Sequence, residues 1–164
     1  MMGELSRADL KEISNIINIA ALAYKGKISA DRWKDPYMPT DELCREMENG
    51  VQFYGWRENN LLVAVMGIQF VKDVTLIRHA YVLPSYQRKQ VGAKLLNHLL
   101  SLAPTSKVYV GTWEAAWWAV KFYQKYGFKL VSSEEKNKLL KRYWSIPERQ
   151  IETSVVLKLE RPKQ

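Results

Sequence analysis

The segment RHAYVLPSYQRKQVGAKLL, residues 78–96, contains the transition that decides the fold. An apolar strand pattern ends at Pro84, a polar and cationic turn follows, and a helix with an apolar stripe begins at about residues 90–92. The first N–H groups of a helix have no partner within the helix, and the helix dipole is positive there. The turn therefore predicts an anion-binding site.

Three residues of this turn favour an anion. Gly92 lets a ligand approach the backbone closely, and Arg88 and Lys89 add charge that complements phosphate groups. The alternative is an ordinary helix start whose basic side chains are solvated. Two familiar phosphate loops are excluded, because the sequence contains neither the pattern G-x-x-x-x-G-K-[ST] nor G-x-G-x-x-G.

The rest of the chain predicts alternating helices and strands around this segment. Helices are expected at residues 7–24, 41–49, 91–103, 114–126 and 133–144, and strands at 51–57, 61–70, 74–83, 107–112, 128–132 and 151–160. Thr40 is the expected cap of the second helix, and Ser132 with Glu135 fits a capping box. A right-handed crossover makes the strands at 74–83 and 107–112 parallel. The prediction is an α/β fold with a mixed, mostly antiparallel sheet and helices on both faces.

Composition limits the class of protein. With 164 residues, 47% of them hydrophobic, one globular domain over residues 1–164 is expected. The single Cys44 excludes an internal disulfide and a cysteine zinc site, and no metal is expected. The polar N-terminus does not resemble a secretory signal, and the longest apolar run, residues 61–68, is too short for a membrane helix. A cytoplasmic protein without a membrane partner is expected.

The net charge of +8 raises the concentration of anions near the surface. Nucleic acid, anionic lipid and a phosphorylated cofactor would all be attracted, and so the charge alone does not choose among them. A nucleic-acid binder ranks last, because no RNP-like or helix-turn-helix pattern supports it.

Two stretches resemble signatures of the GNAT superfamily of N-acetyltransferases. The string VLPSYQRKQVGA, residues 82–93, resembles the acetyl-CoA loop [QR]-x-x-G-x-[GA], with Gln87 at its first position and Gly92 at its last. Gln90 stands where the family usually has glycine, at a helix start whose φ angle we expect to be open to any residue. The string AVKFYQKYGF, residues 119–128, resembles the second signature A-x-x-F-Y-x-K-x-G-F.

The resemblance implies a binding mode for acetyl-CoA. The strand at 74–83 would splay from its parallel neighbour, and pantetheine would pair in the gap with the backbone of Ala80, Tyr81 and Val82. The diphosphate would be held by backbone amides of the loop, whose residues are Gln87, Arg88, Lys89, Gln90, Val91, Gly92 and Ala93. Ala116 replaces an asparagine often found before the second signature, so one polar contact with the donor is expected to be lost.

The resemblance also implies the chemistry, direct attack of an amine on the thioester. Tyr123 matches the family tyrosine that acts as general acid, and we expect it one position round from a core face formed by Ala119, Phe122 and Tyr126. The early-strand glutamate of many members is missing here, which leaves His79 as the candidate general base. Two alternatives stay open: His79 has a purely structural role, or a water relay leads the proton to a distant carboxylate. His98 is expected to face solvent.

The amine acceptor is expected to bind among aromatic residues. Tyr24, Trp33 and Tyr37, together with the segment at 143–149, would line its cleft, and the alternative is that these residues are simply core. The sequence thus favours an N-acetyltransferase for a small-molecule or peptide amine, with a non-catalytic acyl-CoA-binding module as the alternative. The expected partners are acetyl-CoA and an amine, not nucleic acid or a membrane, and a homodimer is left open.

Overall fold

The computed structural model describes residues 1–162. The strands and helices in this range are β1 (Met2–Glu4), α1 (Leu10–Ala20), α2 (Thr40–Glu48), β2 (Gln52–Glu58), β3 (Leu61–Val71), β4 (Val74–Val82), α3 (Val91–Leu102), β5 (Lys107–Trp113), α4 (Trp117–Lys125), β6 (Lys129–Leu130), α5 (Ser133–Tyr143), α6 (Glu148–Glu152) and β7 (Ser154–Glu160).

The strands form one mixed sheet in the order β1-β2-β3-β4-β5-β7-β6. Antiparallel pairing joins β1 to β2, β2 to β3, β5 to β7 and β6 to β7. The pair β4 and β5, connected through α3, is parallel, and this confirms the predicted mixed, mostly antiparallel sheet. The splaying of this pair stays a prediction.

The chain divides into two compact units that are interleaved along the sequence. The first contains Met1–Ala23, Lys34–Phe70 and Ile77–Ala103, and the second contains Tyr24–Trp33, Val71–Leu76 and the chain from Pro104 onward. Strand β4 contributes residues to both units. The expectation of one domain over residues 1–164 stays a prediction.

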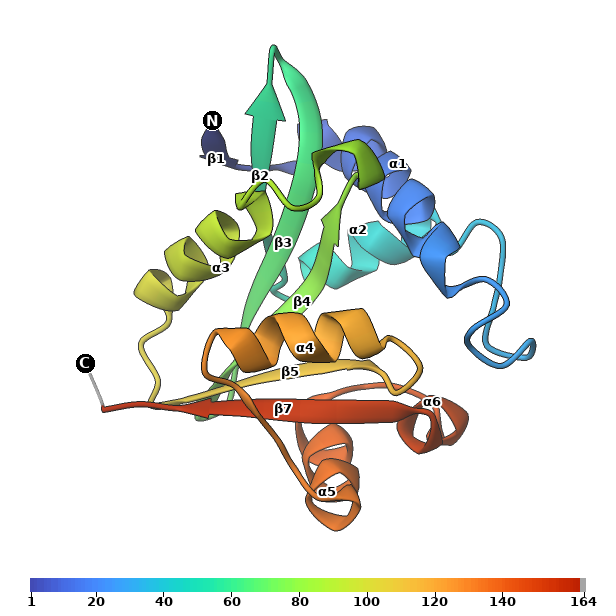
Figure 1. Ribbon diagram of the computed structural model, residues 1–164, viewed down its shortest axis with the longest axis vertical. Helices are drawn as coiled ribbons and strands as arrows, with labels where there is room; N and C mark the ends of the chain where they lie inside the picture. Colours follow the sequence, from blue (N-terminus) through green and yellow to red (C-terminus); the bar gives the residue numbers. More distant parts are fainter. Residues whose placement is uncertain (163–164) are drawn as a thin grey trace. The chain divides into compact units, whose positions relative to one another are not determined.

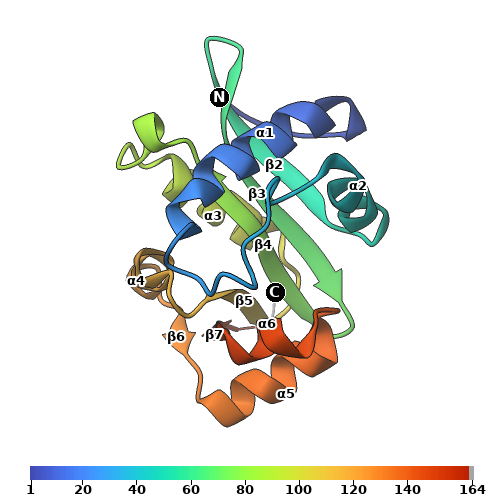
Figure 2. The same cartoon turned by 90° about the vertical axis from the view of Figure 1, so that its right-hand side faces the viewer.

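In the first unit, helices cover both faces of β2 and β3. Helices α1 and α2 lie on one face and α3 on the other (Figures 1 and 2). Helix α1 contributes Ile13, Ile16 and Ile17 to the core, α2 contributes Leu43, and all four side chains are at most 2% exposed. On the opposite face, the ring of His98 in α3 makes an edge-on contact with Tyr54, with centroids 5.1 Å apart. His98 is half-buried, so the expectation that it faces solvent is only partly confirmed: Tyr54 of β2 packs against one side of its ring.

In the second unit, β5 and β7 form the centre, with α4 on one face and α5 on the other (Figure 1). The pairing places Val110 opposite Leu157, whereas Gly111 is opposite Val156 on the other face. A side chain at Gly111 would point at Leu140 of α5. Alternation along these strands thus builds a core on each side.

Several predicted boundaries need correction. A first strand, β1, precedes the first helix, although three residues with no apolar alternation gave no signal for it. The helix predicted at 7–24 is divided into a 3-10 turn, α1 and a second 3-10 turn. The short helix α6 was not predicted. Thr40 is the first residue of α2 and Pro39 is its cap. Half of the expected capping box is confirmed, because the Ser132 hydroxyl accepts a hydrogen bond from the Glu135 amide at 3.2 Å, whereas the described residues show no return bond from the Glu135 side chain. No helix in residues 1–162 combines the length and the apolar character needed to cross a membrane.

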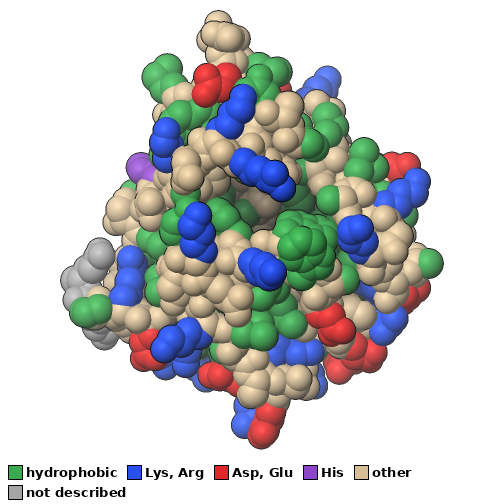
Figure 3. All heavy atoms as spheres, in the orientation of Figure 1, with side chains coloured by type: hydrophobic (Ala, Val, Ile, Leu, Met, Phe, Trp, Pro, Cys, Tyr) green, Lys and Arg blue, Asp and Glu red, His purple; other side chains and the backbone are tan. Residues whose placement is uncertain are grey.

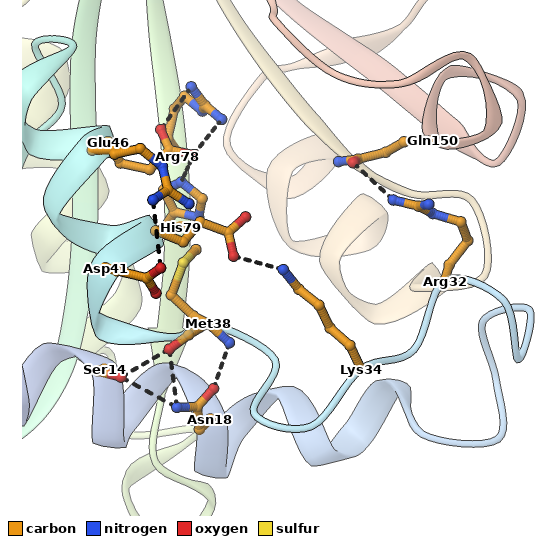
Figure 4. A network of polar contacts seen from close by, with 12 residues as sticks. Ser14, Asn18, Arg32, Lys34, Met38, Asp41, Glu46, Arg78, His79 and Gln150 are labelled. Atoms are coloured by element: carbon orange, nitrogen blue, oxygen red, sulfur yellow. Dashed lines mark hydrogen bonds and ion pairs between the residues drawn. The ribbon is translucent and has the colours of Figure 1, made fainter.

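The segment before α2 is tied to α1 by polar side chains (Figure 4). Asn18 accepts a hydrogen bond from the Met38 amide at 2.6 Å and donates one to the Met38 carbonyl at 3.2 Å. The buried Ser14 hydroxyl donates to the same carbonyl at 2.9 Å. Because both backbone groups of Met38 are satisfied, its side chain can be buried in the core without leaving unpaired polar atoms.

Strand β4 contains an irregularity at His79, whose φ is +54°. Residues with a Cβ rarely adopt this left-handed region. The carbonyl immediately before it, that of Arg78, approaches Gly67 of β3 so closely that a Cβ at residue 67 would lie 2.9 Å from the oxygen. Glycine at position 67 therefore leaves room for the altered path of β4.

The close approach predicts a difference between two glycine substitutions. Gly67→Ala should lower the free energy of unfolding by about 1–3 kcal/mol, because the new methyl group meets a backbone oxygen that cannot rotate away. In Gly111→Ala the nearest atom is 3.4 Å from the new Cβ and belongs to the Trp144 side chain, so the loss should be smaller. Urea unfolding of both variants measures this, and equal losses would contradict the role given to Gly67.

Candidate active site

The predicted anion-binding turn lies between β4 and α3. After Val82 the chain makes a short 3-10 turn, Pro84–Tyr86, and α3 then begins at Val91, as expected. The Gln87 side-chain amide donates a hydrogen bond to the Val82 carbonyl at 3.2 Å. This contact closes the turn onto the end of β4 and fixes where the loop begins.

The first turn of α3 presents backbone N–H groups without a side-chain cap. Its first hydrogen bond runs from the Lys94 amide to the Gln90 carbonyl at 3.0 Å, so the amides of Val91, Gly92 and Ala93 precede the ladder. The Gln90 side chain, at the cap position, makes no capping hydrogen bond. These amides are therefore suited to an anionic ligand.

Two loop residues have left-handed backbone conformations, Arg88 with φ of +65° and Gln90 with φ of +66°. The expectation that the φ angle at residue 90 is open to any residue was wrong. The chain must reverse within a few residues between the end of β4 and the first turn of α3, and the left-handed cap makes part of that reversal. Gln90 thus adopts the conformation for which glycine is the usual choice, and the side chain is exposed.

Basic side chains surround the turn. Arg88 and Lys89 are exposed, and the Lys89 ammonium lies 5.3 Å from the centre of the Tyr86 ring. Lys94, one turn into α3, lies 5.0 Å from the centre of the Trp56 ring. On the face drawn in Figure 3, Lys and Arg side chains are spread over the middle, and acidic side chains lie mostly nearer the margins.

His79 belongs to a half-buried polar cluster with Glu46 and Arg78 (Figure 4). Its Nε2 lies 3.5 Å from Glu46 Oε1, an ion-pair distance without hydrogen-bond geometry, and Nε2 is buried with no hydrogen-bond partner in the described chain. Arg78 donates to Glu46 from Nη2 at 3.4 Å and to Gln69 from Nη1 at 3.1 Å. The imidazole also stacks on Phe53, with ring centroids 5.9 Å apart.

The surroundings shift the pKa values of this cluster in a consistent direction. Burial lowers the pKa of His79 below its ordinary value, and the Arg78 charge adds to this, while Glu46 and more weakly Glu42 oppose it. Burial would raise the pKa of Glu46, but its contact with His79 and the charge of Arg78 outweigh burial and leave the pKa lowered. At neutral pH the cluster therefore contains a carboxylate, a guanidinium and a neutral imidazole.

Tyr123 is the one buried side chain of α4, with 4% of its surface exposed. The expected core face of Ala119, Phe122 and Tyr126 is only half-buried, so the expected orientation of this helix was wrong by about one position. Burial raises the pKa of the Tyr123 hydroxyl well above its ordinary value, with a smaller contribution from Tyr24. Phe128 packs edge-on against its ring at 5.5 Å.

The expected acceptor residues fall in both units, each described separately. Tyr24 and Trp33 belong to the second unit, where the Tyr24 ring stacks on Trp118 of α4 at 6.0 Å. Tyr37 belongs to the first unit and packs against its hydrophobic core. The expected roles of all three in acceptor binding stay predictions.

Sequence reasoning missed Glu46 as a site residue, although a signal was present. Leu43 and Met47 mark the apolar side of α2, and Glu46 lies beside them at helical spacing. A carboxylate on the core-facing side of a helix needs a partner. The two basic residues of β4 supply it.

Comparison with known proteins identifies the family. A family model for the acetyltransferase (GNAT) domain matches residues 19–141. A PaiA N-acetyltransferase from Thermoplasma acidophilum, solved with coenzyme A, is 16% identical with 98% of each chain covered and a TM-score of 0.73. A GNAT-family acetyltransferase from Staphylococcus aureus Mu50 is 17% identical, again over 98% of each chain, with a TM-score of 0.74.

A third similar structure is the ribosomal-protein-S18-alanine N-acetyltransferase from Escherichia coli. It is 16% identical, with 100% of this chain and 95% of that chain covered and a TM-score of 0.69. A search of curated protein sequences gave no match. At such identities the structures show a common fold, and the family-model match covers most of the sequence. The chain therefore belongs to the GNAT family of acetyltransferases, which use acetyl-CoA as the acyl donor.

Proposed function

We propose that the protein is an acetyl-CoA-dependent N-acetyltransferase that transfers the acetyl group to an amine by direct attack on the thioester. The observation that carries this proposal is the loop of residues 87–93, where uncapped helix amides, two left-handed residues and two exposed cations occur together in a GNAT chain. Membership of the family supports acyl transfer in general. The amine acceptor and the cytoplasmic location are part of the proposal.

The loop and the end of β4 would bind the donor. Amides from Gln87 to Ala93 would hold the diphosphate. Those of Val91, Gly92 and Ala93 are directed by the helix start and are not used by a cap, whereas the Gln87 amide already donates to the Pro84 carbonyl at 3.3 Å. The backbone of Ala80, Tyr81 and Val82 would pair with the pantetheine arm. In this binding mode the basic side chains of the loop interact with the phosphate groups of the donor, so they do not imply that the protein binds nucleic acid.

Tyr123 would protonate the departing thiolate. A general acid must carry its proton at the working pH, and burial of Tyr123 holds the hydroxyl in the protonated form. The matching position in the second family signature supports the same role.

His79 would take the proton from the amine. Its lowered pKa keeps the imidazole neutral at pH 7, and the Glu46 carboxylate at 3.5 Å stabilises the imidazolium once it forms. The left-handed conformation of His79 adds to this support, since strained backbone is frequent at functional sites.

Substitution in the loop tests donor binding. Gly92→Glu should abolish binding of coenzyme A, because a carboxylate in the first turn of α3 repels the diphosphate and occupies its place. Asn97→Glu, exposed later on the same helix, is the matched control and should bind normally. Isothermal titration with coenzyme A gives both affinities, and normal affinity of Gly92→Glu would place the donor elsewhere.

A second test addresses the general acid. Tyr123→Phe should lower kcat by about 10²–10⁴-fold, the usual contribution of general acid catalysis, and leave coenzyme A affinity nearly unchanged. Tyr126→Phe removes a hydroxyl from the same helix end and should keep its activity. The measurement is thiol release from acetyl-CoA across a panel of amines. Donor binding without thiol release for every amine, in the wild-type protein, would instead support the acyl-CoA-binding module.

The pH profile tests the base. Since His79 must be neutral to accept a proton, kcat/KM should fall as the pH drops through its lowered pKa, below the ordinary value of 6.5. Glu46→Gln removes a carboxylate that raises this pKa, so the acid limb should move to lower pH. Glu48→Gln, an exposed carboxylate on the same helix, should leave the limb in place. If the acid side of the pH profile of kcat/KM is the same in Glu46→Gln as in the wild-type protein, His79 is not the general base.

A further inference from the structure

Arg32 has a buried donor for which the described chain supplies no acceptor. In residues 1–162, its guanidinium makes one hydrogen bond, from Nη2 to Gln150 Oε1 at 3.4 Å, and its Nε is buried without a partner (Figure 4). The guanidinium also lies 6.0 Å from the centre of the Trp113 ring. A guanidinium offers five N–H donors, and a buried one left unpaired costs free energy. The unpaired Nε–H is therefore a donor that an acceptor from outside the described chain can satisfy.

The segment that carries Arg32 is clamped in place by a neighbouring ion pair. Arg149 donates from Nε to Asp31 Oδ2 at 2.8 Å, and from Nη2 to Asp31 Oδ1 at 3.4 Å and to the Ser29 hydroxyl at 3.0 Å. These bonds join residues 29–31 to α6. Arg149 also pairs with Glu152, from Nη1 to Oε2 at 3.4 Å, whereas no carboxylate of residues 1–162 lies within ion-pair distance of the Arg32 guanidinium.

The surroundings place Arg32 beside the helix that carries Tyr123. Trp113, under the guanidinium, is the last residue of β5, and α4 begins four residues later. At the other end of the segment, Tyr24 stacks on Trp118 of α4. Both ends of residues 24–33 thus contact the junction between β5 and α4 within the second unit.

We propose that Arg32 binds a carboxylate of the acyl acceptor, so that the substrate class is amines that also carry a carboxylate, as amino acids do. This inference rests on the proposed N-acetyltransferase function. A planar guanidinium matches a carboxylate, which can take Nε and Nη2 together. One guanidinium without an ion-pair partner in the described chain matches a singly charged carboxylate, whereas a phosphate dianion would leave negative charge in excess. The Trp113 ring adds an apolar surface beside the anion.

The carboxylate site can be tested without turnover. The NMR resonance of the Arg32 Nε–H in the wild-type protein is assigned by its absence from the spectrum of Arg32→Lys. The probes are N-acetylglycine and N-acetylphenylalanine, and each is compared with its C-terminal amide. The carboxylates should shift this resonance saturably and the amides should not. No shift with either carboxylate, or equal shifts with the amides, would overturn the proposal.

Kinetics then connect the site to the acceptor. For amino acids paired with their amides, Arg32→Gln should raise KM for the carboxylate form by about tenfold to a hundredfold, as expected for a lost charge-assisted contact, and leave the amide form unchanged. Arg7→Gln, which removes an exposed arginine, is the matched control. Equal effects on both forms, or a wild-type preference for amides, would overturn the carboxylate assignment while leaving acetyl transfer intact. Failure to release thiol with any amine would count against the proposed function, and the resonance shifts would still decide the site.

Discussion

Strand β4 and the turn that follows it contain left-handed backbone conformations that are unfavourable for residues with a Cβ, and the proposed base and donor site depend on them. His79, Arg88 and Gln90 all have positive φ without being glycine, at about 1–2 kcal/mol each. The other non-glycine residues of this kind, Asn59, Asn60 and Lys72, lie beside the hairpin turns of β2, β3 and β4, where such angles are ordinary.

Packing on either side of the segment offsets this cost. Helix α3 buries Val91, Leu95, Leu96 and Leu99 almost completely, so its first turn is fixed in position although no side chain caps it. On the strand side, Gln87 closes the turn onto Val82, and Gly67 leaves space beside the Arg78 carbonyl. The free amides are therefore not a frayed end, since the core determines where they point.

The sequence predicted the features that follow from periodicity and missed those that follow from tertiary contacts. The strand at 74–82 and the helix start at Val91 were predictable, because apolar spacing changes from two to three or four there. Strand β1 was not, since the three-residue edge strand Met2–Glu4 has no apolar alternation and is recognised only by its pairing with β2.

The candidate site shows the same division. The loop and Tyr123 could be found from local patterns, since the loop lies at a helix start and Tyr123 lies in the second signature. The left-handed angle of Gln90 could not, because it depends on the path of the whole turn. The pairing of Glu46 with His79 joins residues far apart in the sequence, and only the fold brings α2 against β4.

Burial acts in opposite directions on the two groups proposed for proton transfer. Removing water disfavours whichever form is charged, so it raises the pKa of the Tyr123 phenol and lowers that of the His79 imidazole. At neutral pH the proposed acid thus keeps its proton and the proposed base lacks one, with no charged neighbour needed to set either state. Glu46 opposes burial at His79, because its carboxylate raises the pKa of the imidazole. Without such a carboxylate the pKa of the buried histidine would be lower still, so the strength of the proposed base depends on the position of Glu46 on the inner side of α2.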